Sequence, residues 1–547
     1  MKQWLCVALL ATLSTAGVLA QPAAINGTRI LKHIKVLASD DFEGRKPGTQ
    51  GEEKTVDYLI QQFKSMGLAP GNTDGTYVQK VPLVGMNPTP SPLTFMKDDE
   101  KVNLRHKQDF IAWTRRVTNR VSLESSDLVF AGYGIEAPEY DWNDFSGVDV
   151  TGKTIVVLVN DPPISGPDGQ LDPEVFGGKA MTYYGRWTYK YDKGAEMGAA
   201  GILIVHETGP AGYPWSVVQG FAGERFDLVT PDGNAGKAAV EGWLSLEAAR
   251  NLFKMAGQDF DSLKQAAAKR GFRAMPLGVE VSVSLENQMR TLDSRNVVAR
   301  LDGADPKLRD EYIIYMAHWD HLGKGDPVDG DDIYNGAKDN ASGVAALLEI
   351  AKAFTTVKPA PKRSVLFLAV TAEEQGLLGS EYYAARPIYP LEKTLAAINM
   401  DALNLWGRTR DITVIGMGAS QLDDYLEKAA AGQGRRLRPD PEPEKGYYYR
   451  SDHFNFAKRG VPALYTDEGV EFIDRPDDYG MRVRERYTNE DYHAPSDEVK
   501  PDWDLGGIVE DARLFFVVGY DVANAVRWPE WRANSEFRAI RERMLRK

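Results

Sequence analysis

The pattern of apolar and polar positions divides the chain into a helical beginning, a β-rich middle and a long α/β remainder. Apolar residues at helical spacing predict helices over residues 28–37 and 53–66. Short β-rich runs separated by Gly and Pro follow between residues 81 and 287. From residue 294 strands alternate with helices, and the run 365–370 is uniformly apolar, as in a strand buried on both faces. We therefore predict an α/β fold, a mainly parallel mixed sheet flanked by helices, with an inserted β-rich module.

Imidazole and carboxylate side chains stand at the ends of these apolar runs. His318 closes a predicted strand, and Asp320 follows it as an acceptor that could fix the orientation of a metal-binding imidazole. Asp339 lies among small residues just before a predicted helix, whose N-terminal amides favour a carboxylate. Asp401 ends another apolar run, and His493 lies in a downstream loop. Taken singly, each could equally be an ordinary strand-end residue or a helix cap.

Two adjacent glutamates, Glu373 and Glu374, follow the uniformly apolar run. Carboxylates that emerge together from a buried strand need compensation by cations or by protons. One member of such a pair can bind a metal while its neighbour acts as a general base. A solvated loop pair is the alternative, and it fits poorly with the Gly and Leu residues that come next.

Together these positions provide two imidazoles and three carboxylates, a donor set that suits a pair of Zn²⁺ ions bridged by one carboxylate and a water. The set is His318, Asp339, Glu374, Asp401 and His493. The only cysteine, Cys6, lies in the apolar N-terminal stretch, so a metal in the remainder of the chain must use His, Asp or Glu.

Composition and charge restrict the partners. The formal net charge of -13 makes the chain a poor candidate for binding nucleic acid or an anionic membrane. Lys2, the apolar run 4–19 and the small residues before Gln21 predict a signal peptide over residues 1–20. No later stretch reaches the roughly 18 apolar residues of a membrane span. We therefore expect an exported mature chain, periplasmic or secreted, without a membrane span, and the sequence does not indicate its oligomeric state.

The order of the motifs resembles the M28 family of zinc peptidases, which includes co-catalytic zinc aminopeptidases. The motifs are H-x-D at 318–320, D-N-A-S-G at 339–343, A-E-E-x-G-L-L-G-S at 372–380, N-M-D at 399–401 and Y-H-x-P-S-D at 492–497. The resemblance covers roughly residues 25–110 and 290–525, and it implies a zinc exopeptidase fold. The runs 130–134, 148–159 and 193–204 more loosely resemble a protease-associated (PA) domain. The expected organisation is thus a catalytic domain in two parts, 21–115 and 291–547, around a PA-like domain at 116–290.

The resemblance also implies roles for individual residues. Asp339 would bridge two zinc ions, one completed by His318 and Asp401 and the other by Glu374 and His493. Glu373 would be the general base, and Asp320 would orient His318. Tyr448 would stabilise the oxyanion, although Tyr447 and Tyr449 flank it and the assignment could slip by one position. His321 and His453 are expected to be structural.

These roles predict an aminopeptidase that acts on peptides with a free N-terminus. Three alternatives remain: a carboxypeptidase, a glutaminyl cyclase or a non-catalytic, receptor-like relative. A carboxypeptidase would need a basic pocket for a terminal carboxylate, to which Arg450 could contribute. A cyclase typically uses one zinc, and receptor-like relatives lose ligands, so a complete set of five ligands argues against both.

Overall fold

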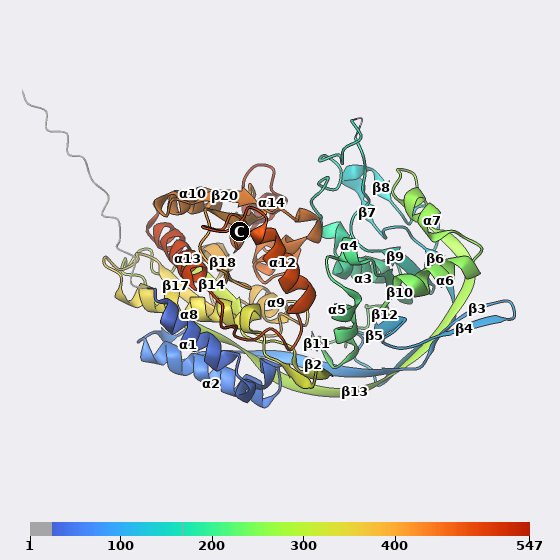
Figure 1. The fold of residues 1–547 in the computed structure, drawn as a ribbon, viewed down its shortest axis with the longest axis horizontal. Coiled ribbons are helices and arrows are strands. Elements are labelled where there is room, and N and C mark those ends of the chain that lie inside the picture. The colour runs from blue at the N-terminus through green and yellow to red at the C-terminus, as the bar shows by residue number, and fades with distance from the viewer. Residues whose placement is uncertain (1–24, 167, 547) are drawn as a thin grey trace, which may run out of the picture.

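The chain forms two lobes that share a pair of long antiparallel strands. The computed structural model describes residues 25–166 and 168–546, so the predicted signal peptide lies outside the described residues. Strands β2 (Val78–Pro90) and β13 (Met275–Leu301) pair along thirteen positions and run beneath both lobes (Figure 1). The sequence predicts separate strands at 279–285 and 296–301, whereas β13 is continuous across both.

The first lobe contains a mixed, mostly parallel sheet. Strand β14 (Tyr312–His318) lies between the parallel strands β17 (Ser364–Val370) and β18 (Thr394–Asn399), and β18 continues parallel to β21 (Ala463–Asp467). The antiparallel neighbours are β13 beside β17 and β19 beside β21. The remaining strands of this lobe are β1 (Ala69–Pro70), β15 (Gly323–Val328), β16 (Asp331–Tyr334), β19 (Asp411–Ile415) and β20 (Arg436–Pro439).

Helices cover both faces of this sheet, which explains why its central strands are apolar throughout. Alternate residues of β14 enter two different clusters: Ile313 and Tyr315 pack with α1, α2, α8 and α13, whereas Ile314 and Met316 pack with α9 and α11. The helices of this lobe are α1 (Gly27–Leu37), α2 (Gln50–Ser65), α8 (Gly343–Thr356), α9 (Leu378–Ala385), α10 (Leu422–Gly432), α11 (His453–Lys458), α12 (Tyr479–Glu490), α13 (Gly506–Asn524) and α14 (Arg538–Leu545). The prediction of an α/β fold with helices on both sides of a mostly parallel sheet is confirmed.

The second lobe has its own sheet and its own apolar clusters. Strands β6, β9, β10 and β12 are parallel neighbours in that order, and β5 closes the edge antiparallel to β12. The elements of this lobe are β3 (Leu93–Lys97), β4 (Glu100–Leu104), β5 (Phe110–Trp113), β6 (Arg120–Phe130), β7 (Glu136–Ala137), β8 (Trp142–Asn143), β9 (Thr154–Leu158), α3 (Trp187–Glu196), β10 (Gly201–Val205), α4 (Thr208–Ala211), α5 (Trp215–Gln219), β11 (Arg225–Leu228), β12 (Val240–Leu244), α6 (Leu246–Met255) and α7 (Phe260–Ala267). Its buried apolar residues form two clusters drawn from residues 93–285, separate from those around β14.

None of the helices within residues 25–546, residue 167 aside, combines the length and the apolar character needed to cross a membrane.

Candidate metal centre

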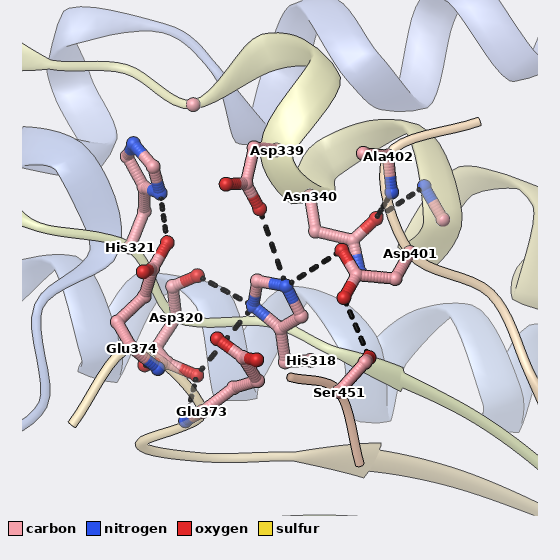
Figure 2. A network of polar contacts seen from close by, with 12 residues as sticks. His318, Asp320, His321, Asp339, Asn340, Glu373, Glu374, Asp401, Ala402 and Ser451 are labelled. Atoms are coloured by element: carbon pink, nitrogen blue, oxygen red, sulfur yellow. Dashed lines mark hydrogen bonds and ion pairs between the residues drawn. The ribbon is translucent and has the colours of Figure 1, made fainter. Parts of the chain in front are cut away.

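The motifs meet at one edge of the first lobe's sheet because the strands that carry them are parallel. His318 is the last residue of β14, Glu373 and Glu374 follow β17, and Asp401 follows β18. Parallel strands bring their carboxyl ends to the same edge of a sheet. Asp339 reaches this edge from the helical turn η5 (Ala337–Ser342) that leads into α8 (Figure 2).

The two carboxylate oxygens of Asp339 face different histidines. Oδ1 lies 3.2 Å from Nε2 of His318, and Oδ2 lies 3.5 Å from Nε2 of His493. On one side His318 Nε2 is also 3.2 Å from Oδ1 of Asp401. On the other side His493 Nε2 is 3.0 Å from Oε2 of Glu374. The five residues that the sequence predicts as metal ligands are therefore brought together as two half-sites that share Asp339.

The electrostatics of this cluster favour added positive charge. Burial opposes a proton on His493, yet Glu374 and Asp339 raise its pKa to about 10. Burial also opposes a proton on His318, but the carboxylates of Asp401 and Glu373 raise its pKa well above its ordinary value. Divalent cations bound by neutral imidazoles and carboxylates would supply this positive charge. Two trios have ligand atoms within 4.8 Å of one another, His318 with Asp339 and Asp401, and His321 with Asp339 and Glu374, and their donors fit zinc.

Glu373 lies beside this cluster on the wall of a pocket that Asp339, Glu374 and Asp401 also line. Burial, together with the neighbouring negative charges of Glu374 and Asp401, raises the pKa of Glu373 well above its ordinary value. A carboxylate in such surroundings has an increased affinity for a proton, which suits a group that must accept one and later release it.

Asp320 supports the site in a way that the sequence only partly anticipates. Its carboxylate lies 3.9 Å from Nδ1 of His318, while its backbone carbonyl is nearer, at 3.2 Å. The carboxylate accepts hydrogen bonds from the backbone amides of Glu373 at 3.1 Å and Glu374 at 3.4 Å. Asp320 therefore fixes the turn that carries the two glutamates as well as lying next to His318.

The structure places Tyr448 away from the pocket, so the prediction that this tyrosine faces the site requires correction. Its hydroxyl is buried without a hydrogen-bond partner among the described residues, and its ring packs against His453 and Phe537. Tyr447, the neighbour that the sequence left as an alternative, lines the pocket instead. The 3₁₀ helix η8 (Tyr447–Tyr449) turns successive side chains in different directions, which sequence spacing alone does not resolve.

Asp497, His321 and Arg45 also shape the site, although the sequence predicted no role there for any of them. Asp497 accepts hydrogen bonds from the backbone amides of Lys338 and Asp339, both at 3.0 Å, and so fixes η5. Nδ1 of His321 forms a hydrogen bond with Oε1 of Glu374, 2.6 Å away. His321 also groups with Asp339 and Glu374 as a possible metal ligand. In the sequence, Asp497 is the last residue of the Y-H-x-P-S-D motif, and His321 directly follows H-x-D.

Arg45 ties the N-terminal segment to the site loops. It is buried, and its guanidinium donates to the carbonyls of Leu37, Trp319, Asn335 and Gly336 at 2.6–2.9 Å. The carbonyls of Trp319, Asn335 and Gly336 belong to the chain just after β14 and just before η5, so Arg45 sets the spacing between the loops that carry His318 and Asp339. No sequence motif marks it, because its partners are all backbone atoms.

Imidazole and carboxylate groups that could hold a metal ion lie at the carboxyl edge of a mostly parallel sheet. Residues 296–517 match the model of peptidase family M28, and this segment is an M28 peptidase domain. This match spans less than half of the chain's 547 residues.

Individual relatives agree with this assignment. Aminopeptidase NAALADL1 of Mus musculus is 36% identical over 134 residues, covering 23% of this chain and 16% of the mouse protein. Leucine aminopeptidase 2 of Trichophyton equinum is 27% identical over 262 residues, covering 46% of this chain and 48% of the fungal protein. The chain thus spans at most about half the length of these relatives. The aminopeptidase from Aneurinibacillus sp. strain AM-1 has a similar fold, with a TM-score of 0.54 and 20% identity over 92% of this chain and 95% of that one.

Proposed function

We propose that this chain is an exported aminopeptidase that binds two zinc ions and hydrolyses the N-terminal peptide bond of peptides. The observation that carries the proposal is the position of Asp339, whose two oxygens face His318 at 3.2 Å and His493 at 3.5 Å. A carboxylate shared in this way between two half-sites is the arrangement that a pair of metal ions requires.

Each residue at the site then has a separate task. His318 and Asp401 would hold one ion, Glu374 and His493 would hold the other, and Asp339 would contribute to both. Bound there, the two ions would polarise the scissile carbonyl, lower the pKa of a water molecule and help to hold the free amine of the substrate. Asp320 and Asp497 keep the two ligand-bearing turns in place through backbone amides.

Glu373 performs the proton transfers. It takes a proton from the attacking water and delivers it to the nitrogen of the leaving peptide, so that the amine departs neutral. Its position on the pocket wall beside Asp339, Glu374 and Asp401 supports this role. Tyr447 lies on the same wall, where its hydroxyl could donate a hydrogen bond to the developing oxyanion.

The activity can be tested by comparing substrates that differ only at the N-terminus. We expect leucine p-nitroanilide to be hydrolysed at least 100-fold faster than its N-acetylated form, because the blocked amine cannot be held at the zinc pair. The rate should disappear on treatment with a chelator and return with zinc. Equal turnover of the free and blocked substrates would contradict the aminopeptidase assignment.

We further propose that residues 1–20 are removed on export and that residues 116–290 form a PA-like domain within a catalytic domain at 21–115 and 291–547. Support comes from the signal-peptide pattern and from the separate apolar clusters of the second lobe. Intact-mass measurement of the protein recovered outside the cytoplasm should give a chain that begins at Gln21. A mass that includes Met1 would count against export by cleavage.

A further inference from the structure

A second, larger cavity lies where the two lobes face each other, and we call it the interlobe groove. Its lining residues come from the segments 136–140 and 180–196 of the second lobe and 414–419, 439–449 and 534–537 of the first. Its volume is about 940 Å³, whereas the pocket at the metal centre encloses about 120 Å³. Tyr447 lines both cavities, so the groove and the metal pocket share a wall.

Tyrosines from both lobes meet in this groove. The ring of Tyr183, in the 3₁₀ helix η3 (Tyr183–Gly185), lies 5.9 Å from the ring of Tyr449 in η8 of the first lobe. Within the second lobe the rings of Tyr183 and Tyr184 lie 5.7 Å and 5.1 Å from that of Tyr189. Tyr183, Tyr184 and Tyr449 are only partly buried, so a ligand in the groove can contact their rings. Aromatic faces of this kind attract ammonium and guanidinium groups.

A carboxylate lies at each end of this row of tyrosines. In the second lobe Oε1 of Glu139 accepts a hydrogen bond from the hydroxyl of Tyr184 at 2.5 Å. In the first lobe Oε1 of Glu536 accepts one from the hydroxyl of Tyr449 at 3.4 Å. Both glutamates are exposed, and within the described chain neither forms an ion pair with a Lys, Arg or His. Two carboxylates without a counter-ion are thus held at the groove, one from each lobe.

The lining of the groove as a whole is acidic. Lys193 is the one cation among the described residues that line it, and Glu136 and Glu196 neutralise it at 3.1 and 2.9 Å. Asp440 adds a further carboxylate on the side of the first lobe. None of these acids belongs to a trio of the described residues whose ligand atoms converge within 4.8 Å. A metal ion needs convergent oxygen ligands, so charge spread in this way suits an extended organic cation better.

The difference in volume indicates where such a cation comes from. A cavity of about 120 Å³ at the metal centre leaves room for little more than the first residue of a peptide, so the following residues must lie outside it. The interlobe groove adjoins that cavity at Tyr447, and its volume falls within the range of ligand-binding sites. The later residues of a long peptide can therefore enter the groove.

We propose that the interlobe groove binds a basic segment of the peptide substrate, downstream of the scissile bond. A lysine or arginine side chain there lies against the tyrosine rings and pairs with Glu139 or Glu536. The second lobe thereby selects substrates, because it provides Glu139, Tyr183 and Tyr184. The inference rests on the proposed function, because the segment must belong to the peptide whose scissile bond lies at Glu373.

Peptides that begin with leucine and carry a single lysine test the proposal. The lysine is moved one position at a time along an otherwise uncharged chain with an amidated C-terminus, and each peptide is compared with its glutamine counterpart. We expect kcat/KM to favour lysine by about 5- to 30-fold, mainly through KM, when the lysine reaches the groove. The preference should fall away as the lysine approaches the scissile bond, because the groove contacts only the downstream part of the peptide.

Variants then assign the preference to the groove. Glu139→Gln combined with Glu536→Gln should bring the ratio of lysine to glutamine peptides close to one. The rate on leucine p-nitroanilide, which is too short to reach the groove, should stay at the wild-type value. Glu247→Gln combined with Glu427→Gln is the matched control, because it removes two charges from exposed positions of α6 and α10 and should keep the preference. A preference that is absent from the wild type, is equal at every position or survives the groove variant would overturn the proposal.

A blocked peptide separates binding in the groove from turnover. The N-acetylated form of the preferred lysine peptide has no free amine to be held at the metal centre, so calorimetry measures its binding without hydrolysis. We expect its Kd to lie about 5-fold or more below that of the acetylated glutamine peptide, with a difference that shrinks in high salt. It should also compete with the free-amine lysine peptide in the hydrolysis assay.

The outcomes of these measurements distinguish the two proposals. Failure of every free-amine substrate to be hydrolysed, with binding of the acetylated lysine peptide intact, would contradict the proposed function alone. Equal Kd values for the acetylated lysine and glutamine peptides would contradict the groove proposal alone. Binding of the acetylated lysine peptide without competition would show that the groove serves a polypeptide other than the substrate, and would overturn the assignment to the substrate.

Discussion

Replacing Glu373 with glutamine is expected to lower kcat by about 10²- to 10⁴-fold and to leave the zinc content at the wild-type value. The amide has nearly the shape of the carboxylate but cannot accept a proton from the attacking water or return one to the leaving amine. KM should change much less than kcat, because the loss concerns the transition state and leaves substrate binding largely unaffected.

The neighbouring glutamate provides the sharpest contrast. Glu374 Oε2 lies 3.0 Å from His493 Nε2, so Glu374→Ala should lose metal as well as activity. Glu381→Gln, at an exposed position of α9, removes one carboxylate charge nearby and should behave as the wild type. Zinc content by atomic spectroscopy and kcat on leucine p-nitroanilide distinguish the three variants. A Glu373→Gln protein with a near wild-type rate, or with its zinc lost, would show that the proton is carried by another group.

The division between these two glutamates illustrates what the sequence could predict. A uniformly apolar strand followed by two carboxylates already indicates a pair of negative charges that needs compensation. The parallel arrangement of β14, β17 and β18 follows from the alternation of strands and helices. His318, Glu374 and Asp401 meet because such strands end at one edge. That reasoning needs only local patterns and the general geometry of parallel sheets.

Features that depend on backbone partners or on tertiary contacts could not be predicted from the sequence in this way. Arg45 bonds only carbonyl groups, so no complementary residue marks it in the sequence. The choice between Tyr447 and Tyr448 depends on the rotation of a single 3₁₀ turn. Arg450 of the first lobe donates to the carbonyl of Ala211 in the second lobe, 239 positions earlier in the chain, and only the folded structure shows this contact. Long-range pairing of this kind is set by packing between lobes and has no periodicity to detect.

The shared position of Asp339 leads to the prediction with the largest effect on metal binding. Asp339→Ala should lose both zinc ions and with them all measurable activity, because each ion would lose a ligand and the two sites would lose their bridge. Asp401→Ala should lose one ion and retain the other, since Asp401 belongs to the half-site of His318, which lies 3.2 Å away, and not to that of His493. Stoichiometry after gel filtration, measured by atomic spectroscopy, separates the two outcomes.

Thermal unfolding tests the shared role of Asp339 without an activity assay. Zinc at 100 times its Kd should stabilise the wild type by about 2.7 kcal/mol for each ion bound and raise its Tm, because the ions bind the folded chain only. Asp339→Ala should fold, since its removal relieves crowding among buried carboxylates, yet its Tm should no longer respond to zinc. Asp331→Ala, at an exposed position of β16, is the matched control and should respond as the wild type does. If Asp339→Ala kept one tightly bound zinc and Asp401→Ala kept none, Asp401 rather than Asp339 would be the shared ligand, and the two half-sites would have to be divided differently around His318 and His493.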